Sequence, residues 1–325
     1  MRVGSITVTP IASESMGVRS MCTRVKTPDV DILFDPSAAL SMRYRLEPHP
    51  LEYQRLQDRL EAIFVAAREA DIISVSHYHH DHVRPGFTDF RYLFSSKEEL
   101  QRMFEGKVVF AKDNRDHINA SQRRRGYFFE RDISGLARSI TWSDGTTHLF
   151  GDTRMTFSAP MPHGPDNTPL GYVVLTTIEC GPDRFLFAPD VQGPVSSSTL
   201  DYILRVRPHL VVIGGPAIYL SGEQHLCDLA LSSLKSIVSE CPIVVVDHHL
   251  MRSSEAHQWL AQLRDVARDV GHSVMSMAEL AGVSVQCFEA ERRYLYESSP
   301  PSAEFMHWTQ SSDEFKASHR PPIDG

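Results

Sequence analysis

A cluster of residue types that bind metals follows an apolar run in the first quarter of the chain. Within the segment SVSHYHHDHVRP, His77, His79, Asp81 and His82 fall in six positions. Residues two apart in an extended chain point to the same side, so His77 and His79 can bind one cation. Asp81 and His82 can turn toward a second. Imidazole and carboxylate are the usual zinc ligands at catalytic sites, so this spacing predicts a metal site.

Further ligand candidates end apolar runs elsewhere in the chain. They are His163 in APMPHGP, Asp190 in FLFAPDVQGP, and His248 or His249 in IVVVDHHLM. Strand ends are where a rigid scaffold presents functional groups to a cleft. We therefore expect these side chains to converge on the first cluster, with the choice between His248 and His249 left open.

The elements that must position these residues begin with short extended segments. Alternation and turn residues predict such segments at residues 4–10, 21–27, 30–35 and 71–76. Apolar residues at 3.6-residue spacing predict a helix from Leu51 to Ala70, with Pro50 at its start. Three more extended segments, forming antiparallel pairs, are expected at residues 147–161, 170–179 and 184–190.

The second half alternates helical and extended patterns. Helices are expected at residues 198–206, 223–239, 253–270 and 277–297, and strands at 210–215 and 242–247. Ser221 and Gln224 form a potential capping box. Strands with interleaved helices in both halves predict an α/β fold, a four-layer αββα sandwich over residues 1–297. Residues 298–325 offer prolines and polar residues without periodicity, which predicts a flexible tail.

Composition narrows the class of protein. The chain has 325 residues, 42% of them apolar, and a formal net charge of −8. No segment approaches eighteen consecutive apolar residues and the N-terminus lacks a signal pattern, so we expect a cytoplasmic protein without a membrane partner. The five cysteines are scattered and form no C-x-x-C pair, which argues against a disulfide framework or a thiolate zinc site. The oligomeric state is left open.

The order of the candidate ligands along the chain is similar to that of a known protein superfamily. The pattern H-x-H-x-D-H, followed by His, Asp and His, resembles the metallo-β-lactamase superfamily, whose fold is the αββα sandwich. More narrowly, VSHYHHDHVRP, INASQRRR, MPHGPDNTPLGYVV, DVQGP and VVVDHHL resemble a group of predicted hydrolases within it, uncharacterised protein family 0282. The similarity runs over about residues 1 to 297.

The resemblance implies a role for each ligand candidate. One metal would be held by His77, His79 and His163, a second by Asp81, His82 and His248, with Asp190 bridging the two. Asp35 would support the ligands from behind. His249 would donate a proton or contact substrate. Two divalent ions are expected, zinc first, with manganese or iron as alternatives.

Such a site has a defined chemistry. Two cations about 3.5 to 4 Å apart lower the pKa of a shared water to near 7 and so supply hydroxide, which Asp81 can orient. Two ions, two carboxylates and one hydroxide leave a net charge of about +1, which attracts anions. Residues 102–138 add nine Lys and Arg against five Asp and Glu. The residues expected to contact substrate are Asn119, Gln122, Arg123, Arg124, Arg125 and Arg252.

Three functions are compatible with these residues. The first is hydrolysis of a phosphate ester or phosphodiester, in a small anionic substrate, a nucleotide or a nucleic acid. The second is hydrolysis of a thioester or lactone by the same hydroxide. The third is a non-hydrolytic metal-binding or redox module. A serine nucleophile is not indicated, because G-x-S-x-G is absent from the sequence.

Overall fold

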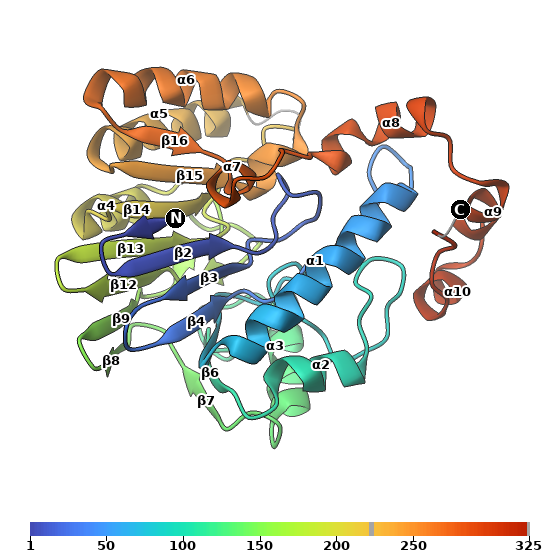
Figure 1. The fold of residues 1–325 in the computed structure, drawn as a ribbon, viewed down its shortest axis with the longest axis horizontal. Helices are drawn as coiled ribbons and strands as arrows, with labels where there is room; N and C mark the ends of the chain where they lie inside the picture. The colour runs from blue at the N-terminus through green and yellow to red at the C-terminus, as the bar shows by residue number, and fades with distance from the viewer. Residues whose placement is uncertain (221–223, 324–325) are drawn as a thin grey trace.

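The fold consists of two mixed β-sheets stacked face to face with helices on both outer sides (Figure 1). The structure is a computed structural model that describes residues 1–220 and 224–323. Each of the two large sheets has seven strands. The predicted αββα sandwich is confirmed.

The first sheet runs in sequence order from β1 to β7. Its strands are β1 (Arg2–Val3), β2 (Ile6–Pro10), β3 (Thr23–Lys26), β4 (Asp31–Phe34), β5 (Ile72–Val75), β6 (Val108–Ala111) and β7 (Ser139–Trp142). Pairing is antiparallel up to β4 and parallel from β4 to β7. The parallel part requires crossover helices, and these are α1 (Pro50–Glu69), α2 (Lys97–Phe104) and α3 (Ala120–Ile133). Helix α1 begins as predicted, with Pro50 in its first turn after a His49 cap.

The second sheet has the order β16-β15-β14-β13-β12-β9-β8. Its strands are β8 (Thr147–Phe150), β9 (Thr153–Phe157), β12 (Thr176–Cys180), β13 (Asp183–Ala188), β14 (Leu210–Gly214), β15 (Ile243–Asp247) and β16 (Ser273–Met275). Helices α4 (Ser197–Val206), α5 (Gln224–Glu240) and α6 (Ala256–Val270) connect its parallel part. Apolar side chains fill the space between the sheets, where the rings of Phe34 and Phe187 lie 5.0 Å apart. A small hairpin, β10 (Met161–Pro162) with β11 (Tyr172–Val173), stands beside this sheet.

Two predicted elements are divided in the structure. The extended segment 147–161 is a hairpin of β8 and β9 that turns at Gly151, whose φ is +56°. The helix expected over 277–297 is two helices, α7 (Met277–Ala281) and α8 (Phe288–Ser298). The first of these ends at Gly282 with φ +71°, a left-handed conformation that glycine adopts readily. Ser221 of the expected capping box lies outside the described residues.

The prediction of a flexible tail is wrong. Residues after α8 form α9 (Ala303–Thr309) and α10 (Asp313–Ser318), which lie beside α1 (Figure 1). Phe305 and Trp308 are buried in the same core as Tyr53. The Lys316 ammonium lies 2.8 Å from the Glu47 carboxylate. Two turns of helix hold too few apolar residues for a 3.6-residue pattern to emerge from the sequence.

Helices long and apolar enough to cross a membrane are absent from the described part of the chain.

Candidate metal centre

The predicted ligands lie where strands of both sheets end at one edge of the sandwich. His77 comes two residues after β5, in a loop closed by a hydrogen bond from the His82 amide to the His79 carbonyl. His163, Asp190 and His248 come directly or shortly after β10, β13 and β15. The topology therefore brings together four segments that are far apart in the sequence.

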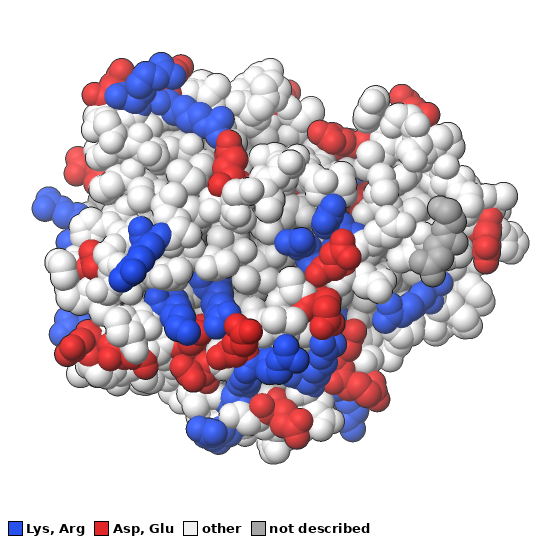
Figure 2. Space-filling model, in the orientation of Figure 1, with Lys and Arg blue, Asp and Glu red and all other residues white. Residues whose placement is uncertain are grey.

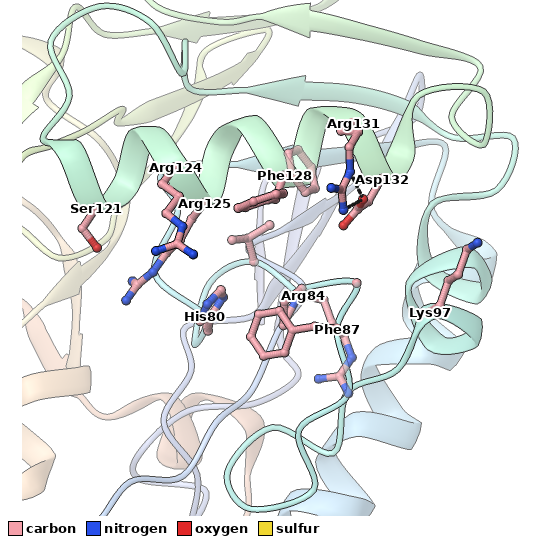
Figure 3. A pocket seen from close by; sticks show the side chains of 14 residues that line it. His80, Arg84, Phe87, Lys97, Ser121, Arg124, Arg125, Phe128, Arg131 and Asp132 are labelled. Carbon is pink, nitrogen blue, oxygen red and sulfur yellow. Dashed lines mark hydrogen bonds and ion pairs between the residues drawn. The ribbon is translucent and has the colours of Figure 1, made fainter. Parts of the chain in front are cut away.

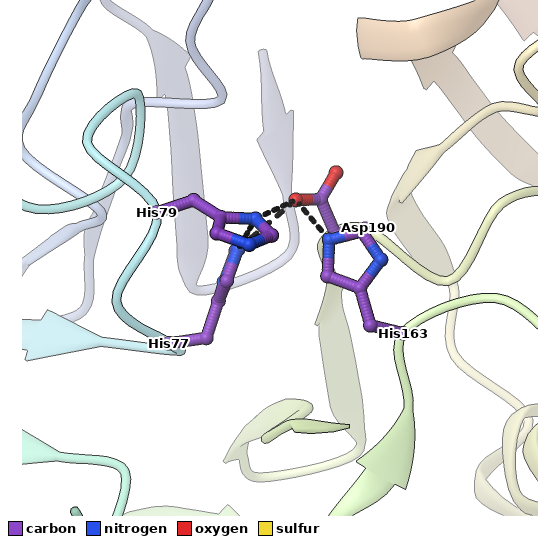
Figure 4. Close-up of side chains that lie close together, drawn as sticks. All are labelled: His77, His79, His163 and Asp190. Carbon is purple, nitrogen blue, oxygen red and sulfur yellow. Dashed lines mark hydrogen bonds and ion pairs between the residues drawn. The ribbon is translucent and has the colours of Figure 1, made fainter. Parts of the chain in front are cut away.

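One group of donor atoms contains His77, His79, His163 and Asp190, whose ligand atoms all lie within 4.8 Å of one another (Figure 4). Asp190 Oδ2 lies 3.0 Å from His77 Nε2 and 2.9 Å from His163 Nε2. His79 Nδ1 lies 3.1 Å from His77 Nε2. Three imidazoles and one carboxylate oxygen thus surround a single point, the arrangement that a tetrahedral cation requires.

A second group contains Asp81, His82 and His248, again within 4.8 Å. Asp190 lies between the two groups, because its Oδ1 is 2.6 Å from His248 Nε2 while its Oδ2 is 3.2 Å from His82 Nε2. One carboxylate therefore reaches both groups, as a bridging ligand would.

The hydrogen bonds behind the second group test whether a cation fits. His82 donates from Nδ1 to Asp35 at 2.8 Å, and His248 donates from Nδ1 to Glu14 at 2.9 Å. Carboxylates that accept from Nδ1 aim both Nε2 atoms at one position, and these two atoms lie 3.2 Å apart. A metal ion bound there would displace the protons that the two rings otherwise hold on Nε2. The donor set fits a metal ion.

Burial and neighbouring charge set the protonation states of the ligands. Burial alone would lower the pKa values of His82 and His248, but Asp190 and other nearby carboxylates raise the pKa of His82 well above its ordinary value and that of His248 to about 9, so a metal ion would displace protons from these two rings. Burial lowers the pKa of His77 well below its ordinary value, and the charge of His82 lowers it further, so the imidazole is neutral. Burial alone would raise the pKa of Asp190. The surrounding histidines, His248 first, hold the pKa of that carboxyl well below its usual range, so it remains ionised.

Two buried carboxylates, Asp35 and Glu14, accept hydrogen bonds from the Nδ1 atoms of ligand histidines and so fix the orientation of their rings. Asp35 accepts hydrogen bonds from the Ser76 amide and hydroxyl, 2.8 and 2.6 Å, as well as from His82, so it lies where it was predicted. Glu14, in the loop after β2, was not predicted from the sequence. No motif marks it, since its partner His248 lies 234 residues further along the chain.

Arg252 requires a correction. It was expected to contact substrate, but its side chain is only 4% exposed and lies between two carboxylates. Its guanidinium is 2.5 Å from Glu14 and 3.2 Å from Asp81. A cation enclosed in this way neutralises the carboxylates that hold the ligands, and its Nε and Nη2 atoms are already engaged by protein groups.

The two adjacent histidines have different positions. His248 is fully buried in the second group, and its φ of +64° turns the chain so that its ring faces Asp190. His249 is 14% exposed; its Nε2 lies 3.2 Å from Asp190 Oδ1 and its Nδ1 lies 3.1 Å from the Tyr219 hydroxyl. The geometry therefore favours His248 as the ligand and places His249 at the rim. Tyr219, in the segment that follows β14, was not predicted.

The residues expected to contact phosphate separate into two sets. The Asn119 side chain caps α3 and donates to the Pro169 carbonyl at 2.8 Å. Gln122 is buried, accepting from the Tyr78 amide and donating to the Leu170 carbonyl. Gln122 thus joins the metal loop (residues 77–82) to the segment after His163, and Asn119 joins α3 to the same segment. These contacts within the protein correct the expected substrate contact.

The arginines that follow are also divided. Arg123 is exposed and donates to the Arg115 carbonyl at 3.2 Å, away from the metal loop. Arg124 and Arg125 instead line a cavity beside His80 (Figure 3). Of the three consecutive arginines, the helix therefore presents two to a space that adjoins the ligands.

Comparisons with known proteins identify the family of the chain. No family model matches the chain. It is 36% identical over 306 residues to a UPF0282 protein of Korarchaeum cryptofilum, covering 93% of this chain and 98% of that protein. It is 39% identical over 295 residues to a UPF0282 protein of Metallosphaera sedula, covering 89% and 92%. Among solved structures, the chain is similar to the metallo-β-lactamase fold protein YhfI from Bacillus subtilis. The sequence identity is 13% and the TM-score 0.49, and the match covers 83% of this chain and 96% of YhfI. By the extent of its similarity to those relatives, the chain belongs to the UPF0282 family.

Proposed function

We propose that this protein is a metal-dependent hydrolase that uses two divalent cations. It cleaves a phosphate ester or phosphodiester bond in a small anionic substrate. The observation that carries the proposal is the position of Asp190. Its two oxygens face two groups of imidazole donors, and the loop that supplies four of the ligands also borders a cavity lined by Arg124 and Arg125. The positive charge of Arg124 and Arg125 and the position of His249 also support the proposal.

Each predicted ligand would bind one of the two cations, except Asp190, which would bind both. His77, His79 and His163 hold one cation, and Asp81, His82 and His248 hold the other, with Asp190 shared. Nitrogen and oxygen donors without thiolate suit zinc, and manganese or iron are alternatives. When bound, such a pair supplies hydroxide at neutral pH and a positive field for the developing charge.

His249 is placed to contact the substrate. If the Tyr219 hydroxyl donates to His249 Nδ1, the ring proton resides on Nε2, which faces the metal-binding edge. A neutral ring in this tautomer can donate a hydrogen bond to a phosphate oxygen while keeping its proton. During hydrolysis, the oxygen of water adds to phosphorus, the phosphorus–oxygen bond to the leaving group breaks, and the proton released by the water ends on the departing oxygen.

Turnover of simple esters with and without metal tests the proposed reaction. Purified protein loaded with zinc or manganese is expected to hydrolyse bis(p-nitrophenyl) phosphate or p-nitrophenyl phosphate, and a chelator is expected to abolish the activity. Restoring the metal should restore it. Turnover of thioesters, with neither phosphate ester cleaved under either metal, would contradict the substrate class.

Replacing Tyr219 with phenylalanine tests the substrate contact of His249. The Y219F protein is expected to lose about tenfold in kcat, the scale of one hydrogen bond, because the ring is no longer held in the tautomer that carries its proton on Nε2. Its metal content should not change, because Tyr219 contacts no ligand that the two groups share. Tyr294→Phe, at a side chain 66% exposed on α8, is the matched control. An unchanged kcat in Y219F would remove His249 from the reaction.

A further inference from the structure

A cavity of about 720 Å³ lies beside the metal loop, between α3 and the segment that follows His82 (Figure 3). Its lining includes His80, Arg84, Phe87, Arg124, Arg125 and Phe128. Cavities of roughly 300 to 1,000 Å³ hold small-molecule ligands, and one this size accommodates a molecule as large as a nucleotide.

The cavity carries positive charge that the protein does not neutralise. Within the described residues, neither Arg124 nor Arg125 forms an ion pair, whereas Arg131 at the far end is paired with Asp132 at 2.5 Å. Arg84 is fully buried; its Nη2 pairs with Glu99, but its Nε and Nη1 have no hydrogen-bond partner. These two Arg84 atoms are inaccessible to solvent, so Arg84 adds positive charge to the cavity wall, whereas the donors that a ligand could reach belong to Arg124 and Arg125.

The same cavity has an aromatic part. The side chains of Phe87 and Phe128 line it and are 52% and 37% exposed. His80 packs edge-on against Phe87 with the ring centroids 5.5 Å apart, and its Nδ1 has no partner. In Figure 3 the two phenylalanine side chains lie on opposite walls of the cavity, where either ring can pack against a flat aromatic group.

The cavity adjoins the candidate metal centre. His80 lies between the ligands His79 and Asp81 in the sequence, and it forms part of the cavity wall. The Arg125 Nη1 atom is 3.5 Å from the Tyr78 carbonyl, also in the metal loop. A ligand seated between the phenylalanines can therefore extend a charged group past the two arginines toward the loop.

We propose that this cavity binds the aromatic part of a nucleotide-sized phosphate ester, an inference that rests on the proposed hydrolase function. The ring lies between Phe87 and Phe128, and Arg124 and Arg125 bind the phosphate at the side next to the metal loop. Stacking and charge together select an aromatic phosphate over a phosphate without a ring.

The net charge of the chain and the charge pattern on one of its faces favour a small ligand over a long nucleic acid. On the face seen in Figure 2, basic and acidic side chains are interspersed over α1 and α2 rather than forming a continuous basic stripe. The whole chain has a net charge of −8. A nucleic-acid backbone would need an extended positive surface along its length.

Calorimetry on metal-free full-length protein tests the cavity separately from hydrolysis. The probes are adenosine 5′-monophosphate and ribose 5-phosphate, which differ in the ring. We expect the adenosine compound to bind about tenfold more tightly, the scale of one stacked base. Phe128→Ala should remove that advantage and leave ribose 5-phosphate binding unchanged, whereas Arg124→Gln should weaken binding of both. Phe315→Ala, at an exposed ring on α10, is the control.

Equal binding of the two probes, or an F128A protein that keeps the preference, would overturn the proposal. A single-stranded oligonucleotide that binds more tightly than both probes and depends on the same side chains would overturn the assignment to a small molecule. These measurements need no metal or turnover. Binding of adenosine 5′-monophosphate without cleavage of any phosphate ester would therefore contradict the proposed hydrolase function and still support the cavity as a binding site.

Discussion

Replacing Asp190 with asparagine is expected to lower the amount of bound metal and to slow hydrolysis by about 10³-fold. The substitution keeps the size of the side chain but removes the negative charge that both groups of ligands share. Metal ions stabilise a transition state by several kcal/mol, and each 1.4 kcal/mol is a tenfold change in rate. Elemental analysis of the purified variant, together with kcat for a phosphodiester, measures both effects.

The same experiment needs variants that separate metal loss from unfolding. His79→Ala should lower metal content in the same direction, because His79 belongs to the first group of ligands. Asp201→Asn, at an exposed carboxylate on α4, should change neither metal content nor rate. Circular dichroism is expected to show folded protein in all three. A D190N or H79A protein that retains its full metal content would show that the two groups do not bind cations as proposed.

Replacing Glu14 with glutamine is expected to weaken metal binding about 10- to 100-fold and to lower the free energy of unfolding by roughly 3–5 kcal/mol. The first effect follows because the Glu14 carboxylate holds His248 Nδ1 at 2.9 Å and so aims its Nε2 at the metal position. The second follows because Arg252, 2.5 Å from Glu14, would keep a buried charge with only Asp81 beside it. Metal competition and chemical denaturation of metal-free protein measure them separately.

A double variant distinguishes these two roles of Glu14. In Glu14→Gln with Arg252→Met, both partners of the buried pair are removed, so much of the lost stability should return. Metal affinity should remain low, because His248 still lacks its carboxylate. If the double variant regained metal affinity together with stability, Glu14 would act only through the fold and not on the orientation of His248.

Local sequence determined the elements and the first half of the site. The alternation around β5, the 3.6-residue spacing in α1 and the ligand spacing after residue 76 are short-range patterns that depend on neighbouring residues alone. For the same reason, the order of the later ligands at strand ends could be predicted, since parallel strands that end at one edge bring their following residues together. Such patterns also predicted the two stacked sheets.

Tertiary structure decided everything that depends on partners far apart in the chain. Glu14 and Tyr219 carry no motif, and each becomes part of the site only through its contact with one histidine of the His248-His249 pair. The choice between these histidines rests on a backbone φ of +64° at His248, which residue type alone does not fix. Gln122 and Arg252 are residue types that often bind substrates, but both side chains are buried and have partners within the protein. Residue type and spacing specify which chemistry is available, whereas burial and long-range packing decide which polar groups remain free to perform it.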